Sequence, residues 1–93
     1  MFDLNQKIKL SDTVSYKEVD GEIVLLDMKS ESFYGLDAVA SDIWRLLQKG
    51  KTLQETYDAL LAIYEVAPEK LLEDLEKFIG RLTESGLIEL VKS

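Results

Sequence analysis

The first third of the chain has the residue pattern of β-strands. Residues 13–19 alternate loosely between apolar and polar positions, and residues 22–28 carry four consecutive apolar side chains. The Asp20-Gly21 step between them suits a two-residue hairpin turn, because both residues tolerate a positive φ. A polar turn then leads to a short third strand at residues 32–35. We predict an antiparallel meander whose middle strand is buried on both faces.

The rest of the chain has the apolar spacing of amphipathic helices. We predict three of them, at residues 38–49, 53–64 and 68–85. Asp37 is a good N-cap for the first helix, and Pro68 suits the first turn of the third. Thr52 and Glu55 have the spacing of a capping box for the second helix. Residues 87–91 are predicted to add a final short strand.

Strands followed by helices predict an α+β domain, in which a three-stranded antiparallel sheet is followed by three helices that cover one of its faces. A winged helix-turn-helix contains the same elements. With 93 residues the chain has the size of one domain, 1–93. Ile8 and Leu10 alternate with lysines near the start. Residues 1–12 are therefore open to two interpretations, an additional strand or a flexible flanking arm.

The composition excludes most kinds of catalytic site. The chain has no cysteine and no histidine, so it lacks a thiolate nucleophile, an imidazole base and the usual ligands of zinc. Its carboxylates are spread singly along polar faces and do not form a calcium-binding loop. We therefore expect no enzyme activity, no metal and no cofactor. A carboxylate-based enzyme is the alternative, and it would need two carboxylates in one pocket.

The net charge of −7 argues against a nucleic-acid partner, because a protein that binds phosphates needs a basic surface. A winged-helix transcriptional regulator is the alternative, but the predicted helix at 53–64 has no basic residue to offer to DNA bases. The chain has no apolar run of about 18 residues, and its start lacks the layout of a signal peptide. We expect a cytoplasmic protein that does not bind membranes.

The third strand, Ser32-Phe33-Tyr34-Gly35, is the first candidate site. In a three-strand meander it lies at the sheet edge, and it carries neither a charge nor a proline to protect that edge. Such an edge can accept an extended peptide as an added strand. Neighbouring side chains point to opposite faces, so core packing of Phe33 or Tyr34 is the alternative interpretation.

The third helix could form the facing wall of such a peptide site. It carries a wide apolar stripe, with one acidic residue at its border. The candidates are Leu71, Leu72, Asp74, Leu75 and Phe78. A stripe of this width is typical of a helix that faces the core, so core packing is the alternative for the apolar residues. A solvated charge is the alternative for Asp74.

In combination, these residues resemble the coenzyme PQQ synthesis protein D-like family. The resemblance spans residues 14 to 90 and is strongest where an aromatic-Gly-Leu-Asp step precedes the first helix. It rests on Ile23–Asp27, Phe33–Asp37, Ile43-Trp44, Thr52, Tyr64, Asp74, Phe78, Leu82 and Gly86-Leu87. Many relatives have asparagine where this chain has Asp37, which keeps the same capping role. The standalone length is most similar to that of the leader-binding proteins of lasso-peptide biosynthesis.

The resemblance implies a RiPP recognition element, a small domain that binds the leader segment of a ribosomally made precursor peptide. The leader would add as a strand on residues 32–35, in the cleft between that strand and the third helix. The domain would not be a catalyst. It would deliver the precursor to a separate cysteine protease that removes the leader and to a cyclase. A PqqD-like peptide chaperone of another RiPP pathway is the alternative that the resemblance leaves open.

Overall fold

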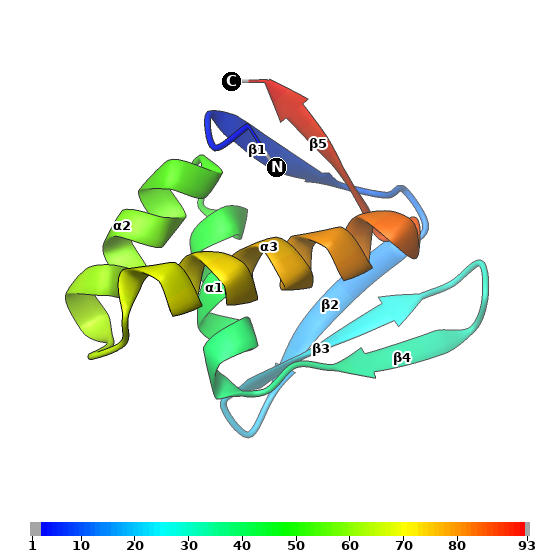
Figure 1. The fold of residues 1–93 in the computed structure, drawn as a ribbon. Helices are drawn as coiled ribbons and strands as arrows, with labels where there is room; N and C mark the ends of the chain where they lie inside the picture. Colours follow the sequence, from blue (N-terminus) through cyan, green and yellow to red (C-terminus); the bar gives the residue numbers. More distant parts are fainter. Residues whose placement is uncertain (1–2, 93) are drawn as a thin grey trace.

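The computed structural model describes residues 3–92, and these residues form five strands and three helices (Figure 1). The strands are β1 (Gln6–Leu10), β2 (Val14–Val19), β3 (Glu22–Asp27), β4 (Ser32–Gly35) and β5 (Ile88–Lys92). The helices are α1 (Ala38–Gln48), α2 (Leu53–Ile63) and α3 (Pro68–Glu84). For residues 6–10, where a strand or an arm was open, the structure forms a strand.

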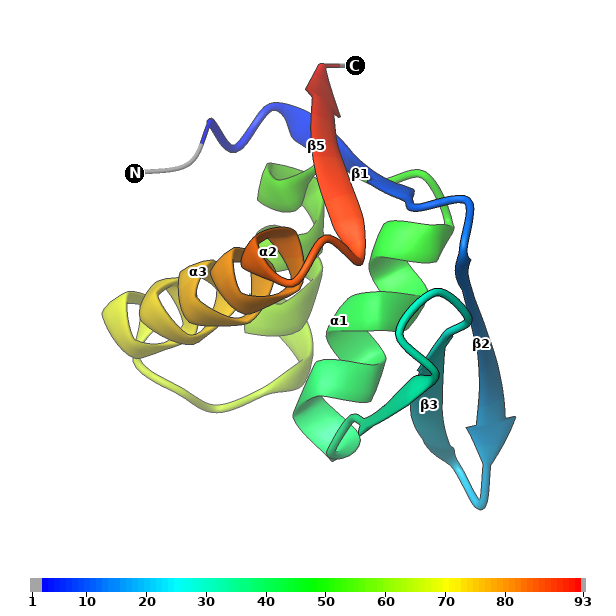
Figure 2. The same ribbon diagram turned by 90° about the vertical axis from the view of Figure 1, so that its right-hand side faces the viewer.

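Strands β2, β3 and β4 form an antiparallel sheet with β3 in the middle. The predicted α+β class, with a three-stranded antiparallel sheet before three helices, is therefore confirmed. Strands β1 and β5 pair separately as a two-stranded antiparallel sheet, so the first and last strands lie side by side (Figure 2). In this pairing Ile8 lies opposite Leu90, so apolar residues that are far apart in the sequence share one face.

The predicted turn and cap residues adopt these roles in the structure. Asp20 and Gly21 both have positive φ, at 53° and 83°, as a tight hairpin between β2 and β3 requires. The Thr52 hydroxyl accepts the Glu55 N–H at 3.1 Å, and the Glu55 carboxylate accepts the Thr52 N–H at 2.8 Å. This reciprocal capping box confirms the start of α2.

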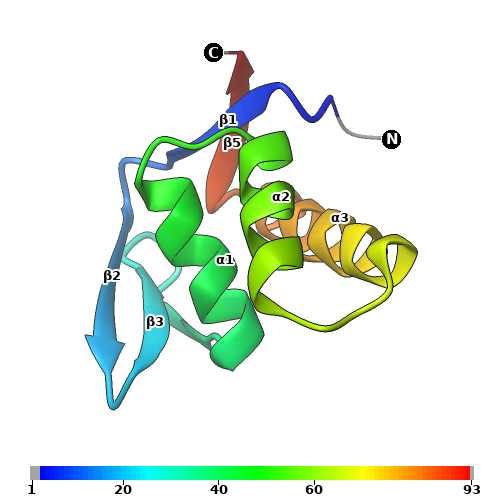
Figure 3. The same cartoon turned by 90° about the vertical axis from the view of Figure 1, so that its left-hand side faces the viewer.

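The core lies between the helices and one face of the three-stranded sheet. Helix α1 stands between this sheet and α2 (Figure 3). Trp44 of α1 is fully buried, and its ring meets Tyr16 of β2 edge-on at 5.4 Å. The prediction that β3 is buried on both faces is wrong. Val24 and Leu26 are only half-buried, because none of the helices in residues 3–92 covers the outer face of the sheet.

The buried Ser41 side chain joins α1 to two strands. Its hydroxyl accepts the Ile23 N–H at 2.9 Å and donates to the Leu36 carbonyl at 3.2 Å. The Leu36 N–H in turn donates to the Ile23 carbonyl at 2.9 Å. This triangle of bonds fixes the position of the chain where β4 ends and α1 begins.

Candidate functional site

Strand β4 is an edge strand. It pairs with β3 along one side, and within residues 3–92 no strand pairs with its other side. It is short and contains no charged residue and no proline, so none of the usual protections of an edge lies within it. The prediction that residues 32–35 form the third strand of a meander is confirmed.

The hydrogen-bond pattern identifies which backbone groups of β4 face the open side. Leu36 donates to Ile23, so residues two and four positions earlier also direct their backbone groups toward β3. Phe33 and Gly35 have the opposite parity. Their N–H and C=O groups therefore point away from the sheet, toward the open edge.

Phe33 and Tyr34 lie on opposite faces of the sheet. Phe33 is cross-strand from Leu26 on the outer face and is 71% exposed. Core packing is thus the wrong interpretation for Phe33. Tyr34 is cross-strand from the buried Leu25 on the helix-facing side, where it is half-buried and packs against the core.

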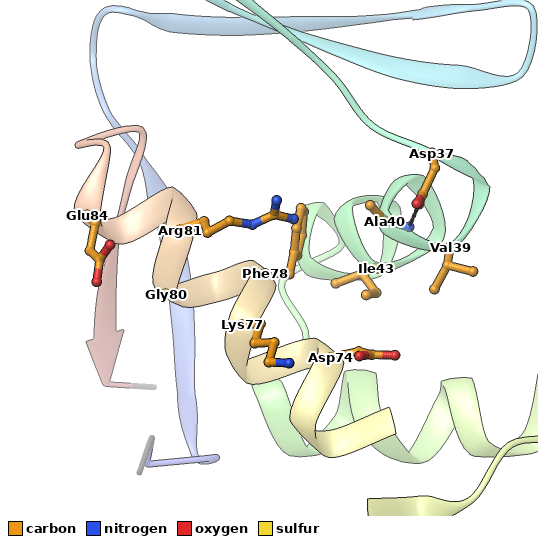
Figure 4. Close-up of a pocket in the computed structure, with 10 residues that line it drawn as sticks. All are labelled: Asp37, Val39, Ala40, Ile43, Asp74, Lys77, Phe78, Gly80, Arg81 and Glu84. Atoms are coloured by element: carbon orange, nitrogen blue, oxygen red, sulfur yellow. Dashed lines mark hydrogen bonds between the residues drawn. The ribbon is translucent and has the colours of Figure 1, made fainter. Parts of the chain in front are cut away.

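A groove separates this edge from α3, and we call it the β4–α3 groove. It consists of two hollows of about 690 and about 300 Å³. The smaller lies between the end of β4, at Tyr34 to Leu36, and the last turns of α3. The larger lies between the start of α1 and α3 (Figure 4). Both hollows share three residues of α3, which are Phe78, Arg81 and Glu84.

The candidate wall residues of α3 divide into two groups. Phe78 and Asp74 line the groove. Leu71 and Leu75 line neither hollow and are buried in the core, whereas Phe78 belongs to the core and also borders the groove. Leu72 is half-buried and lies outside both hollows.

The groove flank of α3 contains residues that the sequence reasoning missed, among them Lys77 and Arg81. Both continue the helical spacing that begins at Asp74 and Phe78. That spacing is present in the sequence, but the apolar stripe of the helix indicated the core-facing flank and not the groove flank. Asp37 also lines the groove, where it caps α1 by accepting the Ala40 N–H at 2.8 Å.

Two ion pairs join charged side chains of α3. Lys70 donates to Asp74 at 2.8 Å, and Lys77 donates to Glu73 at the same distance. The hydrogen bond and charge of Asp74 raise the pKa of Lys70, and those of Lys77 lower the pKa of Glu73. Both shifts favour the charged forms of Lys70 and Glu73.

The described residues offer little for other kinds of site. Within residues 3–92 no group of three acidic side chains gathers closely enough to hold a metal ion. None of the helices in this part of the chain has the length and apolar character needed to cross a bilayer.

The fold and the exposed edge are those of a small winged-helix-like domain. The family model of coenzyme PQQ synthesis protein D matches residues 22–88, which include β3, β4 and all three helices. The chain belongs to this family. A search of curated proteins gave no significant match.

Two solved structures are similar over nearly the whole chain. One is described as TbiB1 in complex with the TbiA(beta) leader peptide; it is 41% identical, with a TM-score of 0.82, and the alignment covers 87% of this chain and 94% of that one. The other is described as lasso peptide synthetase B1 complexed with the leader peptide. It is 25% identical, with a TM-score of 0.82, and the alignment covers 89% of this chain and 98% of that one.

Proposed function

We propose that this protein binds the leader segment of a ribosomally made precursor peptide as an added antiparallel strand on β4. The observation that carries the proposal is the open edge of β4, where Phe33 and Gly35 direct their backbone groups toward the β4–α3 groove. Two similar proteins were solved as complexes with leader peptides, which supports the same role here.

The added strand has a defined alternation. Leader residues that pair with Phe33 and Gly35 would exchange backbone hydrogen bonds and direct their side chains to the outer face. The leader residue opposite Tyr34 would direct its side chain into the groove, and so would the next groove-facing residue, opposite Leu36. Every second leader residue would therefore contact α3.

The expected binding energies indicate which contacts would supply the affinity for the leader. Phe33 and Gly35 offer roughly four backbone groups, and each bond contributes about 0.5–1.5 kcal/mol. A micromolar Kd requires about 8 kcal/mol after the cost of association, so backbone pairing alone is too weak. Burial of roughly 200 Å² of apolar surface in the groove would add about 5 kcal/mol. Groove-facing apolar side chains of the leader would then contribute about as much as the backbone bonds.

The protein would act as a binding component and not as an enzyme. It would present the precursor to a separate leader peptidase, a cysteine protease, and to a cyclase, in lasso-peptide biosynthesis. The description of one similar structure as a lasso peptide synthetase supports this pathway over another RiPP pathway. A DNA-binding role has less support, because α2 contains two acidic residues and no basic one.

The first experiment is a fluorescence-anisotropy titration with a labelled TbiA(beta) leader peptide, with a labelled DNA duplex as the control. We expect saturable binding of the peptide and none of the duplex. Phe33→Pro removes an outward N–H and places a ring in the path of the new strand, so it should weaken binding more than about tenfold. Phe33→Ala keeps the N–H and should weaken binding less than about threefold.

Tyr34→Pro is a useful contrast. The Tyr34 N–H faces β3, so proline at this position would remove a bond inside the sheet and lower the melting temperature of the free protein. Phe33→Pro should leave that temperature nearly unchanged, because edge strands tolerate proline where the N–H faces outward. Equal binding by the Phe33→Pro and Phe33→Ala variants would contradict strand addition on β4.

A further inference from the structure

Arg81 lies where the two hollows of the β4–α3 groove meet. It lines both of them, and its side chain extends from α3 toward α1, beside Phe78 (Figure 4). A peptide added to β4 would pass this point, because the smaller hollow is also lined by Tyr34 and Leu36. Arg81 is thus placed to meet groove-facing side chains of the peptide.

The Arg81 guanidinium has no ion pair and no hydrogen bond with any residue in the described range 3–92. The second arginine of the chain differs. Arg45 bonds to the carboxylates of Glu18 and Asp42 and to the Gly21 carbonyl. The planar guanidinium of Arg81 therefore keeps its fork of N–H donors available for a partner, and a carboxylate fits that fork best.

The other charged residues of the groove differ from Arg81 either in having an ion-pair partner or in carrying a negative charge. Lys77 also lines the groove, but Glu73 already pairs with it at 2.8 Å. Three carboxylates line the groove as well, those of Asp37, Asp74 and Glu84. None of them lies within 4.0 Å of the Arg81 nitrogens. Because these carboxylates and the net charge of −7 repel an acidic peptide residue elsewhere, an acidic residue would be favoured only beside Arg81.

Strand addition by itself does not fix the register of the peptide. A slip by two residues would restore the same backbone bonds to Phe33 and Gly35 and keep the same side chains in the groove. A single charge pair at one position distinguishes the two registers, because a slipped peptide would leave the pair unmade.

We propose that Arg81 binds an acidic side chain of the leader peptide and thereby selects the register of the strand added to β4. The acidic residue would be the groove-facing one opposite Tyr34 or the next groove-facing one, opposite Leu36. This inference rests on the proposed function, since it names a specificity determinant of the same site.

The test is a charge scan of the labelled TbiA(beta) leader peptide, in which each position is replaced in turn by Asp and by Lys. Anisotropy titrations are run with the unchanged protein, with Arg81→Glu and with Lys49→Glu, which alters the net charge by the same amount at an exposed position outside the groove. Thermal melts of the free variants check that all three proteins are folded.

We expect one peptide position at which the unchanged protein prefers Asp over Lys by roughly tenfold. Arg81→Glu should reverse that preference at that position alone, and Lys49→Glu should retain it. If Arg81→Glu alters all positions by one common factor, or none, Arg81 does not select the register and the inference is overturned. If the unchanged protein binds no peptide of the series, the proposed function itself fails, which is a different result.

Discussion

Replacing Ser41 with alanine should destabilise the protein far more than the loss of one small hydroxyl suggests. The Ser41 side chain is fully buried and satisfies two backbone groups, the Ile23 N–H and the Leu36 carbonyl. Ser41→Ala would leave both groups buried without a side-chain partner. Each orphaned group costs about 1–3 kcal/mol, so we expect a loss of about 2–6 kcal/mol in the free energy of unfolding.

That loss is large for a chain of 93 residues, whose total stability is expected to be roughly 5–10 kcal/mol. One kcal/mol shifts the melting temperature of a domain of this size by roughly 4–8 °C, so Ser41→Ala should lower it by at least about 10 °C. Urea unfolding followed by the fluorescence of the buried Trp44 measures the loss directly. The slope against urea should stay unchanged, because the variant exposes the same surface on unfolding.

Ser15→Ala is the matched control. Ser15 lies on the exposed outer face of β2, where the same chemical change removes no buried bond. We expect it to alter the free energy of unfolding by less than about 0.5 kcal/mol. If Ser41→Ala costs no more than this control, the triangle of bonds at Ser41 does not hold the end of β4, and the reasoning is refuted.

Two further predictions concern stability. Thr52→Ala removes the side-chain half of the capping box of α2 and should cost about 1 kcal/mol in urea unfolding; a cost near zero would show that the cap contributes nothing. The Ser30 hydroxyl, with further bonds from Lys29 and the Thr13 hydroxyl, lowers the pKa of Asp27, so the folded state favours the ionised carboxylate. Stability should therefore be full at neutral pH and fall as the pH drops through this lowered pKa, and Asp27→Asn should flatten that slope in urea titrations across the acid range.

The sequence predicts the elements well because their signals are local. A hairpin turn needs positive φ at both central residues, and Asp20-Gly21 supplies it within two positions. The N-terminal caps of α1 and α2 each depend on a side chain three residues from its partner, as at Thr52 and Glu55. Such signals need no knowledge of the rest of the fold, so the bounds of the helices and of the sheet strands followed from them.

The candidate site was predictable only in part, because helical periodicity cannot distinguish a core flank from a groove flank. Leu71 and Phe78 have equivalent spacing on α3, yet only Phe78 lines the groove. Which flank is open depends on how α3 crosses the sheet, and that depends on contacts between distant segments. The same limit applies to the outer face of β3, where Leu26 belongs to a continuous apolar run but lies on a face that no helix of the described residues covers.

The orientation of the edge amides is the feature of the site that depends most on distant contacts. A shift of one residue between β3 and β4 would exchange the faces of Phe33 and Tyr34 and direct the other set of N–H groups outward. The turn at residues 28–31 cannot prevent this shift alone, since β4 is only four residues long. The bond from the Leu36 N–H to the Ile23 carbonyl sets the parity, and Ser41 of α1 holds both strands at that point. The buried hydroxyl that stabilises the fold is therefore also the group that determines which backbone donors an added peptide would meet.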